Sequence, residues 1–210
     1  MPSGLPVAVI GGSSFWHNES NETCSLIGIS LARIDEVVLV TGGIAGVGEV
    51  VGNAFFKERM ALAKLCNLFH VLPVGSSPSQ HGKTIYAGTT MKERREILGH
   101  VSDIYIAVEG GEGTAHEASV ALSRGAMVVP VGRSGGFAQE LYLHGRPSWC
   151  SQMEWQILGA IESTPQEIAK AVSAIIARFG ANNTACGSQS PTGSGPSTPS
   201  GQEMTRPDNG

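Results

Sequence analysis

Long hydrophobic runs are missing from the 210-residue sequence. The longest apolar stretches, such as VVLV and MVVPV, are far shorter than the roughly 20 residues that a membrane-spanning helix needs. The N-terminal segment MPSGLPVAVIGG has neither the charged start nor the long apolar stretch of a signal peptide. We therefore expect a cytoplasmic protein that does not associate with a membrane.

Charge and cysteine are also scarce. Charged residues make up 15% of the chain, the net charge is -4, and no basic stretch is interleaved with aromatic residues. This composition argues against nucleic-acid binding. The four cysteines, Cys24, Cys66, Cys150 and Cys186, have no C-x-x-C spacing, so we interpret them as reduced thiols and expect no structural metal site.

Several familiar motifs for cofactors and catalysis are absent. Neither the dinucleotide fingerprint G-x-G-x-x-G nor the Walker A motif G-x-x-x-x-G-K-[ST] occurs, although GGIAGVG (42–48) and HGKT (81–84) each contain part of one. The segment GGSSF (11–15) lacks the second glycine of a G-x-S-x-G nucleophile elbow. NAD enzymes, ATP enzymes and hydrolases of these classes are therefore disfavoured.

Short apolar segments instead alternate with segments of helical character. Stretches rich in Val and Ile are typical of parallel strands covered on both faces, and they lie at 6–10, 37–41, 68–74, 104–108 and 127–131. Helices are expected at about 20–33, 47–65, 89–100, 114–124 and 165–179, and a loop at 75–88. This alternation predicts a single α/β domain over residues 1–180, with a Rossmann-like, doubly wound parallel sheet flanked by helices. Residues 181–210 are rich in Gly, Pro, Ser and Thr and are expected to form a disordered tail.

Glycine clusters follow three of the expected strands: GGSS (11–14), TGGIAGVGE (41–49) and EGGEGTAHE (109–117). The carboxyl ends of parallel strands meet at one edge of the sheet, where open α/β folds bind ligands. Backbone N–H groups at that edge, followed by a helix N-terminus, bind phosphate well. Any one cluster can be only a tight turn, but the three together favour a ligand cleft with a backbone floor.

Charged side chains accompany this edge. In TTMKERREIL (89–98), one of Arg94 and Arg95 can face the sheet edge while the other stays in solvent, or both can form a solvated face paired with neighbouring glutamates. Glu117 falls in the first turn of the following helix, three residues after Thr114. It is either a capping or helix-dipole residue, or a carboxylate that faces the cleft.

The segment MKERREILGHVSDIYIAVEGGEGTAHEA (91–118) resembles the paired signature of the LOG family, M-x-x-R-K, then a strand, then P-G-G-x-G-T-x-x-E. This family, also described as lysine-decarboxylase-like or of cytokinin phosphoribohydrolase type, lies within the SLOG Rossmann-like superfamily. VAVIGGSS and TGGIAGVGEVVGNAF resemble the family's first two glycine loops, so the resemblance covers about residues 6–131. It implies an N-glycosidase that cleaves a nucleoside 5′-monophosphate to free base and ribose 5-phosphate, with no metal or cofactor.

The resemblance also implies roles for individual residues. Arg94 and Glu117 would be the catalytic pair, since a carboxylate stabilises an oxocarbenium-like ribose and orients water, while a guanidinium holds phosphate or assists the leaving base. The residues that would bind the nucleotide and its phosphate are Gly11, Gly12, Ser13, Ser14, Thr41, Gly42, Gly43, Gly110, Gly111, Gly113 and Thr114. Related proteins are commonly homodimers, and the apolar segment 54–65 is either an interface or part of the core.

The sequence departs from the family signature inside the third glycine loop. Glu109 replaces the proline of the motif and Glu112 occupies its variable position, which places two acids beside the expected phosphate site; Arg95 replaces the lysine. Acids that point toward the site would oppose a phosphate. Two alternatives therefore stand beside the hydrolase: a non-catalytic SLOG module that senses a nucleotide or an ADP-ribose-type ligand, and a nucleoside deoxyribosyltransferase-like enzyme with Glu117 as nucleophile.

Overall fold

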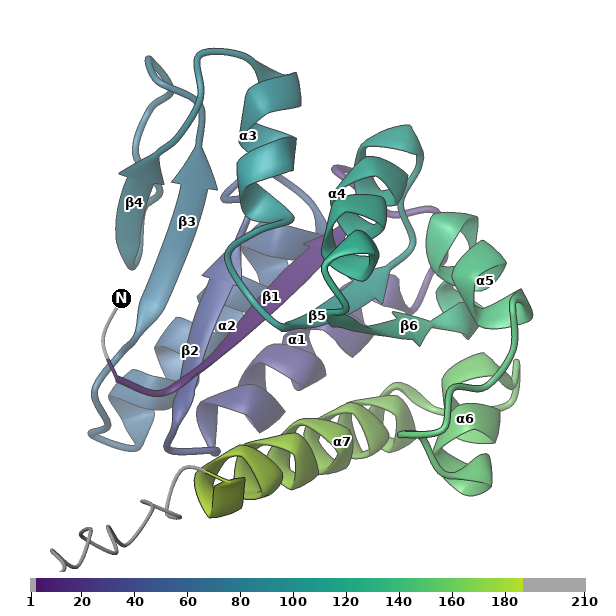
Figure 1. The fold of residues 1–210 in the computed structure, drawn as a ribbon. Coiled ribbons are helices and arrows are strands. Elements are labelled where there is room, and N and C mark those ends of the chain that lie inside the picture. Colours follow the sequence, from purple (N-terminus) through teal and green to yellow (C-terminus); the bar gives the residue numbers. More distant parts are fainter. Residues whose placement is uncertain (1–2, 187–210) are drawn as a thin grey trace, which may run out of the picture.

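The computed structural model describes residues 3–186, with side chains described through residue 181. Its centre is a six-stranded, wholly parallel sheet with the strand order β4-β3-β2-β1-β5-β6 (Figure 1). The strands are β1 (Leu5–Gly11), β2 (Val37–Thr41), β3 (Leu68–Leu72), β4 (Lys83–Tyr86), β5 (Ile104–Val108) and β6 (Met127–Val131). The Rossmann-like α/β fold expected from the sequence is confirmed.

Helices cover both faces of the sheet (Figure 1). One face carries α1 (Ser20–Ala32), α2 (Val47–Ala61), α6 (Gln152–Gly159) and α7 (Pro165–Cys186), and the other carries α3 (Met91–Leu98), α4 (Glu112–Ser123) and α5 (Gly136–Leu143). A short 3₁₀ helix (Gly132–Ser134) follows β6. Successive strand residues point to opposite faces. Along β1, Val7 and Val9 therefore join the first core, while Ala8 and Ile10 join the second.

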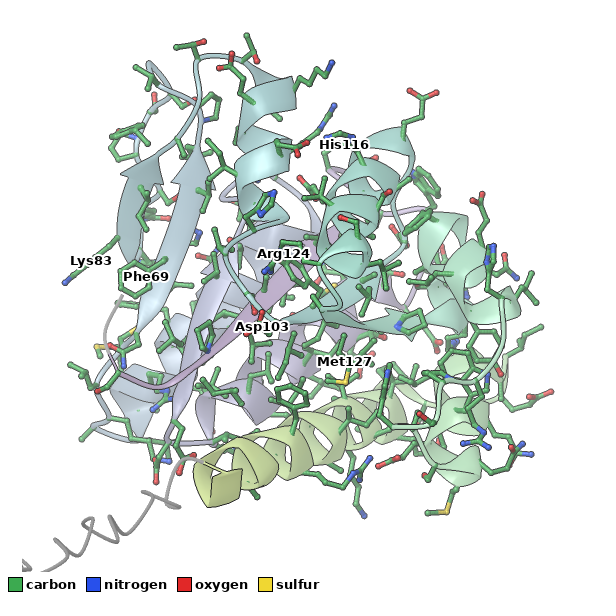
Figure 2. All side chains as sticks on the ribbon, viewed as in Figure 1. Phe69, Lys83, Asp103, His116, Arg124 and Met127 are labelled. Atoms are coloured by element: carbon green, nitrogen blue, oxygen red, sulfur yellow. The ribbon has the colours of Figure 1, made fainter. Side chains whose placement is uncertain are left out.

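Strand β4 lies within the segment that the sequence analysis expected to be a loop. Its four residues form the edge of the sheet, and Lys83, Ile85 and Tyr86 are exposed. Lys83 points away from the sheet into solvent (Figure 2). An edge strand with exposed side chains carries no apolar run, so the pattern that identified the buried strands does not mark it.

Helices α5 and α6 were not expected either. No side chain caps the start of α5, which follows Gly135, so its N-terminus has no recognisable signal. In contrast, α6 begins with a capping box between Ser151 and Glu154, a signal that the sequence does contain. Helix α7 continues to Cys186, so it includes the first six residues of the tail that was expected to begin at residue 181. The rest of that predicted tail, 187–210, lies outside the described residues.

The strand order reverses at β1. The chain passes from β1 outward to β2, β3 and β4, and then returns through α3 to place β5 on the other side of β1. Val9 pairs with Thr41 of β2 and with Ile106 of β5, which brings the carboxyl ends of these three strands to the same edge. Such a switch point opens a crevice between the diverging loops. Within the described residues, no helix has the length and apolar character needed to cross a membrane.

Candidate functional site

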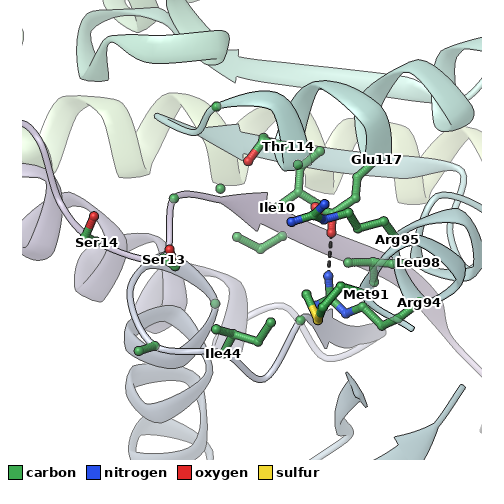
Figure 3. Close-up of a pocket in the computed structure, with 18 of the residues that line it drawn as sticks. Ile10, Ser13, Ser14, Ile44, Met91, Arg94, Arg95, Leu98, Thr114 and Glu117 are labelled. Carbon is green, nitrogen blue, oxygen red and sulfur yellow. Dashed lines mark hydrogen bonds and ion pairs between the residues drawn. The ribbon is translucent and has the colours of Figure 1, made fainter. Parts of the chain in front are cut away.

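A cavity of about 400 Å³ lies at this switch point. It is enclosed by the loops that follow β1, β2 and β5 and by α3 and α4 (Figure 3). Most of the residues predicted from the sequence line it: Gly11, Gly12, Ser13, Ser14, Gly42, Arg94, Gly111, Gly113, Thr114 and Glu117. Glycine loops that are far apart in the chain therefore meet around one cavity, as parallel strand ends dictate.

Arg94 and Glu117 form a buried ion pair at one end of the cavity (Figure 3). Thr90 caps α3 by accepting a hydrogen bond from the backbone N–H of Glu93, and Arg94 then falls on the buried face of this helix. Its Nη1 lies 2.5 Å from Oε1 of Glu117, and its Nε donates to the carbonyl oxygen of Val71 at 2.8 Å. Only 3% of Arg94 and 5% of Glu117 is exposed, so the pair is shielded from bulk water.

Burial has the largest effect on the titration of both partners. It raises the pKa of Glu117, and the positive charges of Arg94 and Arg95 oppose that rise. It lowers the pKa of Arg94, and the charge of Glu117 opposes that decrease. A guanidinium stays protonated in proteins, so Arg94 remains a cation. No described residue donates a hydrogen bond to Oε2 of Glu117, which leaves this oxygen for a group inside the cavity.

Gly42 makes room for the guanidinium of Arg94. A Cβ at this position would lie 1.8 Å from Nη2 of Arg94, closer than any two such atoms can approach. This glycine was predicted as a phosphate-binding residue, and it does line the cavity. The absence of a side chain at Gly42 is also needed for the ion pair, because any larger residue would push Arg94 away from Glu117.

The N-terminus of α4 and Arg95 create a positive region in the same cavity. The helix begins after Gly111 without a side-chain cap, so its first backbone N–H groups have no intrahelical partners. Thr114 is buried in the first turn and lines the cavity. The guanidinium of Arg95 lies over this turn, since a Cβ at Gly113 would be 2.9 Å from Cζ of Arg95. A helix N-terminus, a hydroxyl and an arginine without an ion pair to any described residue suit a phosphate.

Both arginines of α3 therefore line the cavity, whereas the sequence analysis left one of them in solvent or both on a solvated face. Arg94 is buried in its pair with Glu117, and Arg95 is half-buried at the cavity wall. Both side chains extend from α3 toward the first turns of α4 (Figure 3). Arg95 is thus a site residue that the sequence analysis did not assign.

The two acids of the third glycine loop do not line the cavity. Glu109 is fully buried, and its carboxylate accepts hydrogen bonds from the backbone N–H groups of Trp16 at 3.1 Å and His17 at 2.9 Å. Its own N–H donates to Oγ of Ser134 at 2.8 Å. Glu112 is exposed at the start of α4. Neither carboxylate therefore points into the cavity: that of Glu109 is held by backbone N–H groups behind its wall, and that of Glu112 lies in solvent.

Three of the predicted residues, Thr41, Gly43 and Gly110, do not line the cavity. Thr41 is buried below it, where Oγ1 forms a hydrogen bond with Nδ1 of His70 at 2.7 Å and accepts one from the N–H of Gly43 at 3.1 Å. Gly110 has a positive φ of 94° and lies against Thr114, whose Oγ1 would be 2.2 Å from a Cβ on this glycine. These residues support the loops rather than the cavity surface.

The cavity is completed by residues that were not predicted as site residues: Val9, Ile10, Trp16, Ile44, Ala45, Gly48, Met91, Arg95 and Leu98. Most are apolar residues in or beside the recognised segments, and no spacing rule separates them from core positions. Among the described residues, no group of His, Cys, Asp and Glu side chains is arranged to hold a metal ion.

Similar folds occur among solved structures at low sequence identity. The molybdenum cofactor carrier protein of Chlamydomonas reinhardtii has a TM-score of 0.56 at 20% identity, covering 83% of this chain and 99% of that one. The molybdenum cofactor binding protein of Rippkaea orientalis has a TM-score of 0.56 at 21% identity, with coverages of 82% and 98%. The structural-genomics target TM1055 has a TM-score of 0.57 at 20% identity, with coverages of 66% and 81%.

At these identities the likeness shows the fold alone, and no curated protein matches in sequence. The SLOG cluster4 family matches residues 5–148, a segment that contains the whole sheet and every residue that lines the cavity. The match extends over more than half of the chain, and it shows that this protein belongs to the SLOG cluster4 family.

Proposed function

We propose that this protein hydrolyses the N-glycosidic bond of a nucleoside 5′-monophosphate, the activity expected from its resemblance to the LOG family. The observation that carries the proposal is the position of Glu117. Its carboxylate lies inside the cavity, is only 5% exposed, and is held by Arg94 beside the positive first turn of α4. A site that offers one anion-binding region and one oriented carboxylate suits a phosphorylated sugar.

In the proposed complex the 5′-phosphate lies at the N-terminus of α4. Backbone N–H groups at Gly111 and Gly113, the hydroxyl of Thr114 and the guanidinium of Arg95 hold its oxygens. The loop of Gly11 to Ser14 closes the cavity on the other side of the phosphate. The ribose then lies deeper along α4, and its C1′ carbon comes within reach of Glu117, one helical turn after Thr114.

The proposed chemistry uses Glu117 at the ribose. The bond between C1′ and the base nitrogen breaks with its electron pair leaving on the base, and a water oxygen forms the new bond to C1′. Glu117 stabilises the positive charge that develops on the ribose and orients this water. One proton of the water passes to the departing base. Arg94 acts as a positioning residue, since it fixes one carboxylate oxygen and opposes the rise in the pKa of Glu117 that burial causes.

A second candidate is binding without turnover. Arg94 neutralises much of the charge of Glu117 through a hydrogen bond of 2.5 Å, and a neutralised carboxylate stabilises a cation less well. The protein would then carry or sense a phosphorylated ligand, such as a nucleotide or an ADP-ribose-type molecule. Two proteins of similar fold are named for carrying or binding the molybdenum cofactor, which adds that cofactor to the ligands to be tested.

The test compares release of free base from a panel of nucleoside 5′-monophosphates by wild type, Glu117→Gln and Glu112→Gln. Both variants make the same change on the same helix, but Glu112 is exposed and lies outside the cavity. The proposal requires base release that is lost in Glu117→Gln and retained in Glu112→Gln. No release, together with tight binding of a nucleotide or of the molybdenum cofactor, would support the carrier or sensor instead. Exchange of one base for another would indicate the transferase.

We also propose that the protein is a cytoplasmic homodimer. At the C-terminal end of α2 and just beyond it, Met60, Leu62 and Leu65 are 51%, 43% and 76% exposed, while Phe55 of the same segment is buried in the core. The segment 54–65 thus contributes to the core and still presents apolar side chains to solvent. Sedimentation equilibrium of the purified chain distinguishes a dimer from a monomer.

A further inference from the structure

Trp16 is a large aromatic side chain exposed between two cavities. It is 59% exposed, lines the cavity at the switch point, and also lines a neighbouring cavity of about 360 Å³. His17, Arg133 and Gln139 also border the second cavity. Trp16 is therefore the side chain at which the two cavities meet.

The indole is held in place without any ligand. The backbone N–H of Trp16 donates to both carboxylate oxygens of the buried Glu109 at 3.1 Å, and the N–H of His17 donates to one of them at 2.9 Å. The ring lies against two glycine loops, since a Cβ at Gly136 would be 2.5 Å from its Cζ3 and a Cβ at Gly111 would be 3.8 Å from its Cη2. A side chain at Gly136 would displace the ring, whereas the contact at Gly111 is an ordinary van der Waals distance.

Trp16 lies beside the N-terminal end of α4, and this location limits which part of a ligand the indole can contact. Trp16 lies at Gly111, before the first turn of the helix, whereas Glu117 lies six residues later, about 9 Å along the helix axis at 1.5 Å per residue. The proposed phosphate site at Gly113 and Thr114 lies between them. A ribose whose C1′ reaches Glu117 directs its base onward, toward Arg94 and away from Trp16.

The base that is cleaved therefore does not stack on Trp16. An exposed, fixed indole beyond the phosphate fits a planar ring attached on the far side of that phosphate. The second cavity gives such a ring space, and the amide of Gln139, which forms no hydrogen bond with the side chain of any described residue, lies at its border. Arg133 is already paired with Glu19, so this cavity suits an uncharged ring and sugar better than another phosphate.

We propose that Trp16 is the stacking platform of a second subsite, and that the ligand is a nucleotide joined through its phosphate to a second planar heterocycle. Glu109 is the positioning residue that presents the indole. This inference rests on the nucleotide site proposed above and specifies its ligand as one with two ends: a ribose at Glu117, a pyrophosphate over the α4 N-terminus, and a purine-like ring on Trp16. It also accounts for the acid that replaces the proline of the LOG signature.

The test measures the affinities of AMP and of diadenosine diphosphate by calorimetry, with Glu117→Gln as the parent so that neither probe is consumed. Diadenosine diphosphate adds a second phosphate, a second ribose and a second adenine ring to AMP, and the Trp16 variants separate the contribution of the ring from those of the other two groups. We expect it to bind the parent on the order of 10-fold more tightly than AMP, as stacking of one base on an aromatic side chain provides. Adding Trp16→Ala should lower the affinity for diadenosine diphosphate by much more than the affinity for AMP and so remove that difference, while Trp16→Phe, which keeps a ring, should retain most of it.

Equal affinities of the two probes for the parent would overturn the inference. So would an equal loss of affinity for both probes in Trp16→Ala, because the indole would then support the phosphate site in general. The outcome is independent of turnover. Base release by the wild type without a Trp16-dependent difference removes only the second subsite, and a Trp16-dependent difference without base release removes only the hydrolase.

Discussion

Replacing Arg94 by methionine should destabilise the protein through the carboxylate that it leaves behind. Methionine occupies similar buried space but donates no hydrogen bond. Glu117 is only 5% exposed, so water from the cavity replaces the lost contact of 2.5 Å only in part, and the carbonyl of Val71 loses this donor as well. Removal of one partner from a buried ion pair typically costs about 3–5 kcal/mol. We expect a loss of this size in the free energy of unfolding at pH 8, measured by urea denaturation.

The pH dependence of that loss tests its cause. Burial raises the pKa of Glu117, and Arg94 opposes the rise. In folded Arg94→Met the pKa of Glu117 therefore lies further above the ordinary value of 4.5 than it does in the wild type. A carboxyl group of this kind destabilises the fold only where the unfolded chain has released its proton. The penalty is therefore absent below 4.5 and grows as the pH rises toward the folded pKa. Arg94→Met should consequently lose much less stability at pH 5 than at pH 8.

A double variant completes the experiment. Glu117→Gln removes the charge that Arg94→Met strands, so the combination should regain about 2 kcal/mol at pH 8, with the unpaired amide accounting for what is still lost. A loss below about 1 kcal/mol in Arg94→Met, or the same loss at both pH values, would refute the buried ion pair as the source of stability.

Other perturbations test the surroundings of the pair and one distant contact. Gly42→Ala should reduce base release at least 10-fold, because its Cβ displaces the guanidinium of Arg94, whereas Gly48→Ala, whose Cβ would meet no atom closer than 3.5 Å, should not; equal effects would remove the steric argument. Arg95→Gln should weaken binding of inorganic phosphate about 10-fold in calorimetry with an unchanged melting temperature, and an unchanged affinity would place the anion elsewhere. Glu154 pairs with Arg178 at 2.8 Å, which lowers the pKa of Glu154 to about 2. The stabilisation that this ion pair gives the fold is fully present above pH 4.5, the ordinary pKa of a glutamate, and is lost as the pH falls toward 2. Relative to Glu154→Gln, the wild type should therefore lose about 1–2 kcal/mol over that interval in urea denaturation, and parallel pH profiles would contradict this assignment.

The buried strands could be predicted from the sequence because parallel strands covered on both faces need apolar residues at every position. The edge strand β4 and the uncapped helix α5 obey no such requirement, and both were missed. The glycine loops were found for a related reason. A cavity whose wall is formed by backbone at the carboxyl edge of the sheet requires glycine at several positions, and such glycine clusters can be recognised in the sequence.

The roles of single side chains were harder to predict, because they depend on contacts between distant segments. Glu109 looked like an acid beside a phosphate, but its partners are the N–H groups of residues 16 and 17, more than 90 positions away. At least one of Arg94 and Arg95 was expected to stay in solvent, but the cavity extends around α3 far enough to include both. Local spacing describes one helix face and gives no information on what that face meets.

The catalytic role of Glu117 is best tested by the stoichiometry of products from a single nucleoside 5′-monophosphate that the wild type accepts. We expect free base and ribose 5-phosphate in equal amounts, formed by the wild type and by Glu112→Gln but not by Glu117→Gln. Product formation that persists in Glu117→Gln, or a nucleotide that binds in the cavity and stays intact with every variant, would contradict the assignment of Glu117 as the catalytic carboxylate.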